Sequence, residues 1–450
     1  MAVTGHDSTH DIIAPDGAQH NMPVVSPWVR RSRTQRRLLW SSIGIPVRGD
    51  KRRFRARAAA LALVLVLASS AVPGRARASA LSSDVVDGSS ASRRKLDVAA
   101  LPDVTVKEGA VVDGDGRVLW ARTPDVRRPM ASITKIMTAV VALEHSSLSD
   151  VVVVPREAVT VGQSSAGLVA GEKLTMQELL EALLVKSGND AAVTIAAHVG
   201  GSQAAFVSMM NEKAGELGLS DTHFANPHGL DAPRHYTTAD NLAVLARYAM
   251  AKPAFRDIVR RSKVTIGKGR RRRTLASTDE LLGVYQGMMG IKTGNTDGAG
   301  YSVVSAAQRQ GVMLYAIVLG TKSDRQRFLD AKALMDWGFA HYRPMQIAEK
   351  GSVVAEAPVS SYLDVTVPLT FAQDVTIPVL DVDGTIQRTV NVSPVPAPVE
   401  VGQQAGVATY RQGERVIATV PLVATKQVKG PNPIEATWIA IVRVWQRIFG

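Results

Sequence analysis

The stretch PMASITKIMTAVVALE, residues 129–144, places a lysine inside one of the most apolar segments of the chain. Its apolar residues, from Ile133 to Leu143, predict a buried helix. A charged side chain in such a helix is costly unless it has partners or a chemical task. Lys135 follows Ser132 by about one helical turn, so both side chains share a face. The segment therefore predicts a core helix that carries a candidate reactive pair.

Ser132 and Lys135 form the pattern SxxK, which by itself has little specificity. A chain of this length contains roughly one or two such patterns by chance, and Ser92 with Lys95 forms another. Ser132, however, lies at a predicted helix start, where free backbone N–H groups and the helix dipole favour negative charge. Burial lowers the pKa of a lysine, so a neutral fraction can accept the serine proton. The plain alternative is that Lys135 extends from a core helix into solvent.

Two further motifs make the pattern specific. The segment KSGND places Ser187 and Asn189 as SxN after an amphipathic helix, on an expected loop. The segment GIKTGNT places KTG, residues 292–294, at the end of a strand-like run. A chance KTG has a probability of roughly a tenth in such a chain. The three motifs in order on helix, loop and strand are far rarer than any one of them.

The order of periodic segments predicts the fold class. The segment GAVVDGDGRVLWAR predicts a hairpin around Asp113–Gly116, and helical periodicity dominates residues 132–250. Strand-like runs then return as GMMGIKTG, GYSVVSAAQ and VMLYAIVLG, followed by a helix through DRQRFLDAKALMDWGF. Strands at both ends with helices between predict an α/β sandwich whose sheet mixes N- and C-terminal strands.

In these motifs and their order the chain resembles the penicillin-recognising serine acyltransferases, and in particular the serine-type D-alanyl-D-alanine carboxypeptidases, the low-molecular-mass penicillin-binding proteins of peptidase family S11. The resemblance covers residues 105–340, including SGNDAAVTIAAHVGGSQAAF and YTTADNLAVLA. The segment APVEVGQQAGVATYRQGERVIATVPLVA resembles the β-rich C-terminal domain of the same enzymes. The resemblance implies an α/β (α+β) sandwich with an antiparallel sheet flanked by helices, a small all-β C-terminal domain and a terminal amphipathic helix.

The resemblance also implies a role for each motif residue. Ser132 would attack the carbonyl of the penultimate D-alanine while Lys135 removes its proton, and an acyl-enzyme would form as the terminal D-alanine leaves. Ser187 and Lys292 would relay a proton to the leaving amine. Asn189 would hydrogen-bond the substrate backbone and hold Lys135 in place. The substrate would be a peptidoglycan stem peptide ending in D-Ala-D-Ala, and β-lactam antibiotics would be covalent inhibitors.

Substrate binding is expected at the KTG strand. Thr293 with Lys292 would bind the terminal carboxylate, and Gly294 completes the motif. The backbone N–H groups of Ser132 and Asn295 would form the oxyanion hole. Many relatives carry histidine where this chain has Asn295, but only the backbone is used, so we expect activity to survive.

Other positions match or depart from the family more loosely. Arg327 lies where relatives have an arginine near the substrate carboxylate, and His228 in PHGL is interpreted as structural or as supporting the catalytic side chains. Where relatives often read NTN before LLG, residues 277–279 read STD. The preceding run Arg270–Arg273 is interpreted as a solvated loop or, alternatively, as a contact with anionic wall polymer or lipid headgroups.

Three alternatives to a carboxypeptidase stay open. A DD-endopeptidase would cut peptidoglycan cross-links, although endopeptidase relatives tend to lack the C-terminal β domain. A class A β-lactamase would need a glutamate in an ExxLN segment, and no such segment lies between Asn189 and Lys292. A wall-binding or penicillin-sensing module without turnover would not need every motif residue, yet all of them are present.

Composition argues against several other classes of protein and of site. The net charge of +13 is concentrated at the front, where residues 1–57 hold eleven Lys and Arg against four Asp, so nucleic acid is not an expected partner. The chain has no cysteine and therefore no disulfide. Its nine histidines show no ligand spacing, so we expect neither a metal nor another cofactor.

The organisation of residues 1–100 is predicted from charge and hydropathy. Residues 1–50 are a polar, basic leader expected to be disordered, and residues 51–80 match a signal peptide with an apolar core of 15 residues, Ala58–Val72. Cleavage is expected near Ala78 or Ala80. An uncleaved signal anchor and a start codon assigned too early are the alternatives. Residues 81–100 are Ser-rich and are interpreted as a linker.

The remaining domain boundaries are predicted from changes in composition and in hydrophobic pattern. Residues 101–345 are the expected catalytic domain, and residues 350–428, rich in Val, Thr and Pro, the expected β-rich domain. Residues 431–450 form an amphipathic helix with Trp and Phe on one face and Arg opposite, which is typical of helices that lie on a membrane surface. The alternative is a terminal helix packed on its own protein. The expected location is extracytoplasmic, after secretion across the cytoplasmic membrane, with membrane association.

Overall fold

The structure is a computed structural model that describes residues 83–95, 97–381 and 384–449. The chain divides into two units, Met1–Gly74 and Arg75–Gly450. The predicted leader and signal peptide lie outside the described residues. All elements below belong to the second unit.

The catalytic region contains the following elements, in chain order: β1 (Val85–Val86), β2 (Ser89–Ser90), η1 (Val98–Ala100), β3 (Glu108–Asp113), β4 (Val118–Arg122), η2 (Ala131–Thr134), α2 (Lys135–His145), β5 (Val151–Val153), η3 (Arg156–Thr160), β6 (Lys173–Thr175), α3 (Met176–Leu184), α4 (Asn189–Gly200), α5 (Gln203–Glu216), α6 (Ala239–Ala251), α7 (Pro253–Val259), β7 (Lys263–Ile266), η4 (Gly269–Arg271), β8 (Arg273–Ala276), β9 (Met288–Thr296), β10 (Gly300–Arg309), β11 (Val312–Thr321) and α8 (Asp324–Ala340).

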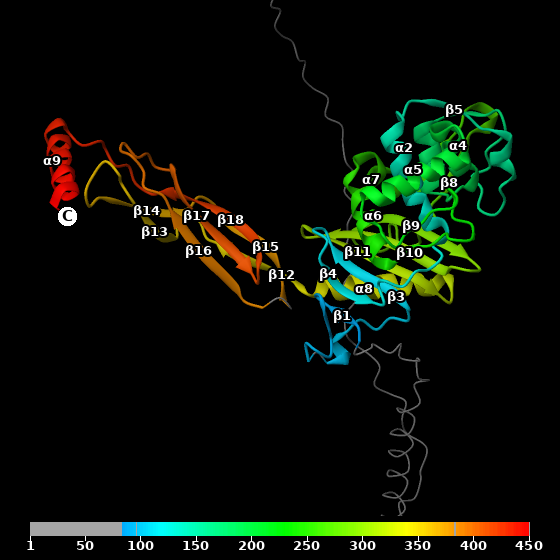
Figure 1. The fold of residues 1–450 in the computed structure, drawn as a ribbon, viewed down its shortest axis with the longest axis horizontal. Coiled ribbons are helices and arrows are strands. Elements are labelled where there is room, and N and C mark those ends of the chain that lie inside the picture. Colours follow the sequence, from blue (N-terminus) through cyan, green and yellow to red (C-terminus); the bar gives the residue numbers. More distant parts are fainter. Residues whose placement is uncertain (1–82, 96, 382–383, 450) are drawn as a thin grey trace, which may run out of the picture. The chain divides into compact units, whose positions relative to one another are not determined.

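A seven-stranded antiparallel sheet organises this region. Its strand order is β2-β1-β4-β3-β11-β10-β9, so strands from both ends of the region lie side by side (Figure 1). The junction is the β3–β11 pair, in which Val111 faces Ala316. Antiparallel hairpins β9–β10 and β10–β11 complete one edge. The predicted mixing of N- and C-terminal strands in one sheet is confirmed.

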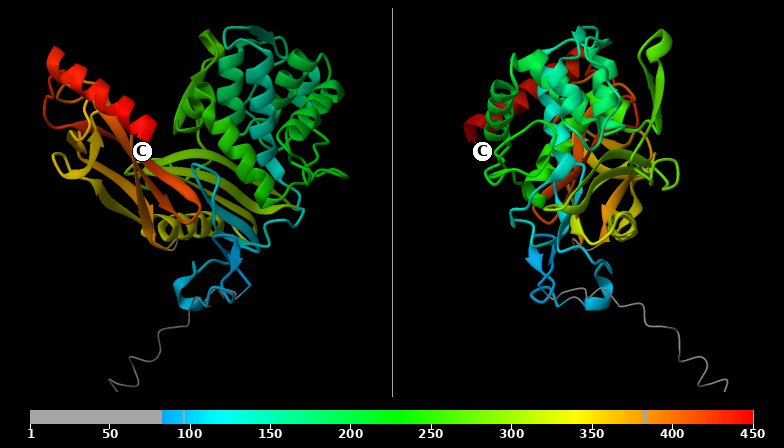
Figure 2. Two further views of the ribbon diagram at one scale, coloured as in Figure 1. Left: turned by 60° about the vertical axis from the view of Figure 1, so that its left-hand side comes forward. Right: turned by 90° about the vertical axis from the view of Figure 1, so that its right-hand side faces the viewer.

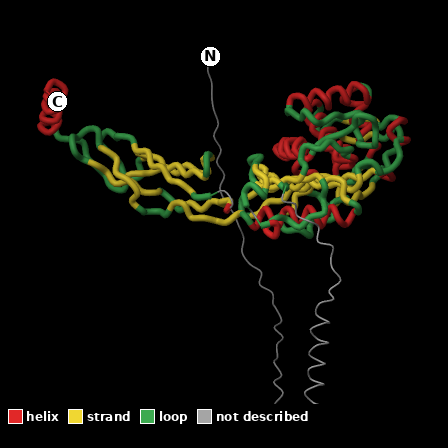
Figure 3. The backbone as a smooth tube through the Cα atoms, turned by 60° about the horizontal axis from the view of Figure 1, so that its bottom comes forward, coloured by secondary structure: helices red, strands yellow, loops and turns green. Residues whose placement is uncertain are grey.

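The sheet is buried on both faces, and side-chain alternation assigns each residue to one of them. In β11, Leu314, Ala316 and Val318 pack into the core that contains α8, whereas Ile317 and Leu319 pack into the helical core on the other face. Figure 3 shows the helices on both sides of the strands. The fold is therefore the predicted sandwich, with an antiparallel sheet between helical layers.

Helix α2 lies at the centre of the larger helical layer, which includes α3 to α7 (Figure 2). Its residues from Lys135 to Ala142 are all buried, as the apolar segment predicts. Helix α3 begins with a complete capping box, in which Thr175 and Glu178 satisfy each other's backbone N–H groups. The motif lysine thus lies at the start of a buried helix within this layer.

Residues 83–95 and 97–100, the described part of the segment 81–100 that was expected as a linker, differ from that interpretation. Strands β1 and β2 extend the sheet, and Val86 and Ala91 are fully buried. Asp84 accepts hydrogen bonds from Arg122 Nε and Nη2, both at 2.8 Å. Two-residue strands are too short to show periodicity, so serine content dominated the interpretation. The linker expectation is wrong for this segment.

The C-terminal region is all-β until its last helix. It contains β12 (Tyr342–Ala348), β13 (Val353–Pro358), β14 (Thr366–Phe371), β15 (Val375–Leu380), β16 (Ile386–Val392), β17 (Gln404–Gln412), β18 (Arg415–Ala424) and α9 (Pro433–Phe449). Five strands pair in the order β13-β14-β18-β17-β16, and β12 pairs with β15. A separate core, including Val367, Leu369 and Leu422, holds the strands together.

The Asp84–Arg122 pair generates a stability prediction. The two side chains are 0% and 6% exposed, and Arg122 Nη1 also donates to the carbonyls of Val104 and Val106 at 3.0 Å. Asp84→Ala leaves the guanidinium without its buried carboxylate, so we expect a loss of about 3 kcal/mol in the free energy of unfolding. Denaturant unfolding measures it.

The matched control is Asp103→Ala, because Asp103 is exposed and lies in the same N-terminal part of the catalytic region. Its effect should stay within about 0.5 kcal/mol. Equal stabilities of the two variants would mean that residues 83–91 do not form part of the folded core.

Candidate active site

The reactive serine candidate lies in a tight turn rather than in a regular helix. Ser132 belongs to the 3-10 turn η2, and Lys135 is the first residue of α2. Ala131, just before the serine, has a positive φ of 48°. Strand β9 packs on this turn, and a Cβ on Gly294 would lie 3.1 Å from both Ala131 Cβ and Met130 O. The glycine of KTG therefore allows the strand to approach the serine turn closely.

Lys135 is the centre of the site's hydrogen bonding. Its Nζ lies 2.8 Å from Ser132 Oγ, 2.7 Å from Asn189 Oδ1 and 2.6 Å from the carbonyl oxygen of His228. Asn189 Nδ2 donates to the carbonyl of Gly162 at 3.0 Å, which fixes the amide so that its oxygen faces the lysine. The structure thus joins SxxK, SxN and the PHGL segment at one nitrogen atom.

The surroundings of Lys135 favour its neutral form. The side chain is fully buried, and burial lowers its pKa well below the usual value; the nearby Lys292 lowers it further, and Asp190 opposes the shift. A neutral amine has two N–H donors and one lone pair. Asn189 Oδ1 and the His228 carbonyl can only accept, so they take the two N–H bonds. The lone pair is then directed at the Ser132 hydroxyl, as a base requires.

The SGN segment enters the site from the end of α3. Ser187 is buried and has a positive φ of 66°, and Asn189 starts α4 instead of lying in the expected loop. The next residue, Asp190, braces the facing loop: its carboxylate accepts from Ser165 Oγ at 2.6 Å and from Ala166 N at 3.0 Å. This brace holds the turn that presents Ser187 and Asn189.

The KTG residues lie on β9, next to the serine turn. Lys292 is buried, its Nζ donates to the carbonyl of Thr293 at 3.0 Å, and burial together with Arg327 lowers its pKa to about 7. Thr293 Oγ1 lies 2.6 Å from Thr278 Oγ1, which ties the KTG strand to the STD segment. Asn295 is exposed and faces Tyr301 across the β9–β10 ladder.

Arg327 reaches the same strand from α8. It is 6% exposed, and its Nη1 donates to the carbonyl oxygens of Gly294 at 3.0 Å and Ser302 at 3.3 Å. It also forms an ion pair with Asp324. The structure therefore places this guanidinium against the KTG strand, although the sequence around Arg327 matches the family only loosely.

Three positioning groups were not predicted. Gly229 has a φ of 96°, and a Cβ there would lie 2.0 Å from Ala131 O and 2.9 Å from Ser132 N. Only glycine fits this contact with the serine turn.

His235 is the second unpredicted group. Its Nδ1 accepts from Ala225 N at 2.9 Å, so its Nε2 carries the proton and donates to Thr134 Oγ1 at 2.7 Å. Burial lowers the pKa of His235 to about 4 and keeps the ring neutral. The signal available in the sequence was the glycine of PHGL.

Asp279 is the third unpredicted group. It is buried, its Oδ1 accepts from Leu281 N at 2.9 Å, and its Oδ2 is buried without a hydrogen-bond partner. Burial raises its pKa, while its negative charge raises the pKa of Lys292. The carboxyl that replaces the second asparagine of the usual NTN thus acts on the KTG lysine.

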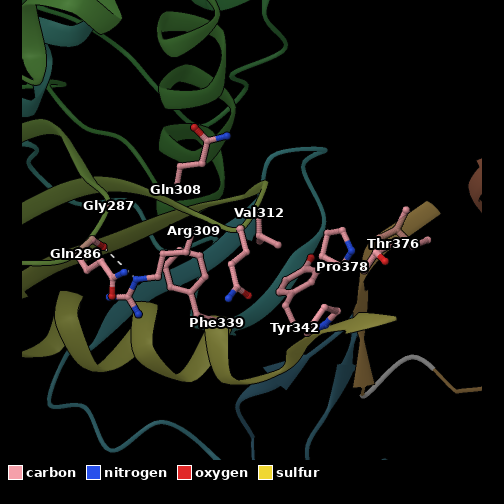
Figure 4. A pocket seen from close by; sticks show the side chains of 12 residues that line it. Gln286, Gly287, Gln308, Arg309, Val312, Phe339, Tyr342, Thr376 and Pro378 are labelled. Carbon is pink, nitrogen blue, oxygen red and sulfur yellow. Dashed lines mark hydrogen bonds between the residues drawn. The ribbon is translucent and has the colours of Figure 1, made fainter. Parts of the chain in front are cut away.

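The described residues contain no group of three or more His, Cys, Asp or Glu that could hold a metal ion. A separate hollow, whose lining includes Gln286, Arg309, Phe339 and Tyr342, contains none of the predicted site residues (Figure 4).

Comparisons with known proteins agree with this geometry. Residues 96–323 match the family described as D-alanyl-D-alanine carboxypeptidase, and residues 342–430 match the C-terminal domain of penicillin-binding protein 5. The D-alanyl-D-alanine carboxypeptidase DacC of Escherichia coli is 30% identical over 372 residues, covering 78% of this chain and 90% of DacC. DacB2 of Mycobacterium tuberculosis, which carries the same enzyme name, is 37% identical over 249 residues, covering 53% and 84%.

A solved structure extends the likeness to three dimensions. Penicillin-binding protein 5 from Haemophilus influenzae superposes with a TM-score of 0.54 at 27% identity, covering 73% of this chain and 99% of that protein. The likeness therefore includes nearly the whole of that relative.

Gly229 generates a prediction specific to the serine turn. In Gly229→Ala the new Cβ must displace Ala131 and Ser132, so we expect acylation by fluorescent penicillin to slow by at least about 100-fold. Time courses of labelling, quenched at intervals, measure the acylation rate.

Gly218→Ala is the matched control, because Gly218 also has a positive φ, 69°, but a Cβ there meets nothing within 4 Å. Its backbone strain should cost stability without slowing acylation. Equal rates in the two variants would show that the Gly229 contact does not set the serine position.

Proposed function

We propose that Ser132 is the nucleophile and Lys135 the general base of this chain, which belongs to the D-alanyl-D-alanine carboxypeptidase family. The protein is a serine-type D-alanyl-D-alanine carboxypeptidase of cell-wall metabolism that removes the terminal D-alanine of peptidoglycan stem peptides and is acylated by β-lactams. The observation that carries the assignment is the buried Lys135 amine, 2.8 Å from Ser132 Oγ with its other contacts to pure acceptors.

Acylation follows from the proton balance at Lys135. The neutral amine takes the hydroxyl proton as Ser132 Oγ bonds to the carbonyl carbon of the penultimate D-alanine. The oxyanion that forms is held by the backbone N–H groups of Ser132 and Asn295. Strand β9 is an edge of the sheet in the described part of the chain, so the substrate backbone can lie along it.

Breakdown of the tetrahedral intermediate needs a proton on the leaving nitrogen. The C–N bond breaks and its electron pair goes to the amine of the terminal D-alanine, while the proton that Lys135 took from Ser132 is relayed through Ser187 and Lys292 to that nitrogen, which leaves Lys135 neutral again. Protonated Lys292 and the Thr293 hydroxyl bind the terminal carboxylate. Arg327, bonded to the Gly294 carbonyl, adds positive charge behind the strand. Water then hydrolyses the acyl-enzyme and restores Ser132.

We also propose an extracytoplasmic location with attachment to the membrane surface through α9. Seven large apolar side chains of this helix are more than half exposed, among them Trp438 at 63% and Trp445 at 61%. On another face, Ile439 is buried and Arg443 donates to the carbonyl of Tyr362 at 3.0 Å. The helix thus touches its own protein with one side and leaves aromatic residues free for a lipid interface. Among the described residues no helix is both long and apolar enough to cross a bilayer.

The function is tested by product analysis. Ser132→Ala should abolish the release of D-alanine from a synthetic pentapeptide, and a digest of labelled peptidoglycan should show shortened stems before any loss of cross-linked dimers. Ser92→Ala removes the other SxxK serine and should leave activity unchanged. A digest in which dimers disappear while stem length is unchanged would identify a DD-endopeptidase instead.

The alkaline limb of the pH profile is predicted from Lys292. Its pKa of about 7 in the free enzyme means that the carboxylate-binding ammonium is lost as pH rises, so kcat/KM should fall above about pH 7. Asp279 raises this pKa, so Asp279→Asn should move the limb to lower pH by about one unit. Steady-state kinetics with a short peptide measure the limb.

Glu280→Gln is the control for Asp279→Asn, because Glu280 is the exposed neighbour. It should leave the limb in place. A limb that Asp279→Asn does not move would exclude Asp279 as a group that sets the charge of Lys292.

The membrane proposal predicts a loss of vesicle binding. Replacing Trp438 and Trp445 by glutamate removes the aromatic anchors and adds repulsion, so binding of residues 81–450 to anionic vesicles should weaken by at least about 10-fold in flotation assays. Gln446→Glu on the same helix adds one charge without removing apolar area and should weaken binding much less. Equal binding of both variants would contradict attachment through α9.

A further inference from the structure

The hairpin β7–β8 carries a cluster of arginines at its tip. Arg270, Arg271 and Arg272 are all exposed; the first two lie in the 3-10 turn η4, and Arg272 follows it directly. The turn depends on glycine: Gly267 has a φ of 77°, and a Cβ there would lie 2.6 Å from Arg271 O. We call residues 270–272 the basic tip.

Ion pairing distinguishes the nearby arginines from those of the basic tip. Arg261 forms an ion pair with Glu181 at 2.6 Å, and Arg273 forms one with Glu172 at 2.8 Å. Within the described part of the chain no acidic side chain forms an ion pair with the three arginines of the tip. Three adjacent, uncompensated guanidinium groups repel one another, and an anionic ligand would remove that repulsion.

The tip is held on a fixed frame. Val264, Ile266 and Leu275 of the hairpin are buried, and Gly267 N donates to Glu178 Oε1 at 3.0 Å. The charges are therefore presented by a packed hairpin, and less conformational entropy is lost on binding than in a free loop.

The frame also connects the tip to the active site. Arg273 Nε donates to the carbonyl of Ala166 at 2.9 Å, and Ala166 N donates in turn to Asp190 beside the SGN asparagine. Six residues beyond Arg272, Thr278 contacts Thr293 of KTG. Six extended residues span at most about 20 Å. A polymer bound at the tip would thus pass close to the substrate strand.

We propose that the basic tip binds a linear wall polymer whose units are joined by phosphodiester groups, and that it holds polymeric substrate near the catalytic cleft. The inference rests on the extracytoplasmic location proposed above. Planar guanidinium groups bind phosphate oxygens in bidentate fashion, and consecutive arginines can contact successive phosphates. Carboxypeptidase activity on a short peptide does not require the tip.

The chemistry of the hairpin favours a soluble polymer over a lipid surface. Membrane-surface binding combines cations with inserted apolar side chains. Between Lys263 and Ala276, all described, no large apolar side chain is exposed. The basic tip can therefore bind by charge alone, which suits a hydrated polyanion.

The test compares the wild-type full chain with the triple variant Arg270→Gln, Arg271→Gln, Arg272→Gln. Poly(glycerol phosphate) is the probe, and binding is measured by titration at several salt concentrations. We expect the triple variant to bind at least about 10-fold more weakly and to lose about two units of slope in the plot of log affinity against log salt concentration, by analogy with other polyphosphates. The KM for wall fragments that carry the polymer should rise.

The matched control neutralises three exposed cations elsewhere, through Lys107→Gln, Arg156→Gln and Lys426→Gln. Both variants keep the basic residues 1–57, so the difference between them reports the hairpin. All three proteins should release D-alanine from a short stem peptide at the same rate. A failure of that release in the wild type would contradict the proposed function, while the binding comparison would still decide the inference.

Two results would overturn the inference. One is equal affinity of the two variants for poly(glycerol phosphate), because the weaker binding would then result from the lower net charge and not from the position of the three arginines. The other is that the tip substitutions weaken binding to vesicles of anionic phospholipid or to single-stranded DNA more than binding to the polymer. Either outcome would mean that the basic tip is not a site for a wall polymer.

Discussion

The hydrogen bonds of one buried amine set the conditions for the rest of the catalytic region. Lys135 Nζ lies within 2.8 Å of a hydroxyl and two carbonyl-type oxygens, and water is excluded from it. A protonated lysine there would lose its hydration and lie near Lys292 without an adjacent carboxylate bonded to it. The surrounding core therefore determines the protonation state, and a change that admits water would remove the base as surely as a change of the lysine itself.

The sheet and the helices supply this environment from distant parts of the sequence. Strand β9 reaches the serine turn because Gly294 has no side chain, and the PHGL loop reaches it from the other side because Gly229 has none. Asp190 and His235 then fix the two neighbouring turns by hydrogen bonds to Ala166 and Thr134. Close backbone packing, more than any single strong interaction, keeps the serine next to the amine.

The sequence predicted the parts of this arrangement that depend on local pattern. SxxK, SxN and KTG have short spacings, and the alternation in β10 and β11 and the apolar run of α2 are visible without a structure. The linker expectation failed at residues 84–91, where two-residue strands and a buried Asp84 carry no periodic signal. His235 and Asp279 were missed because their meaning depends on partners across the fold. For Asp279, the departure from NTN was noticed, but its effect on Lys292 required the sheet.

The mechanism requires that Lys135 is neutral beside Ser132 in the resting enzyme. Nuclear magnetic resonance of side-chain-labelled lysines measures this directly, with the Lys135 signal assigned by its loss in Lys135→Arg. We expect Lys135 to titrate well below the usual lysine value of about 10.4. A Lys135 pKa close to that value would exclude Lys135 as the base, because the amine would then be charged at neutral pH and could not accept the serine proton.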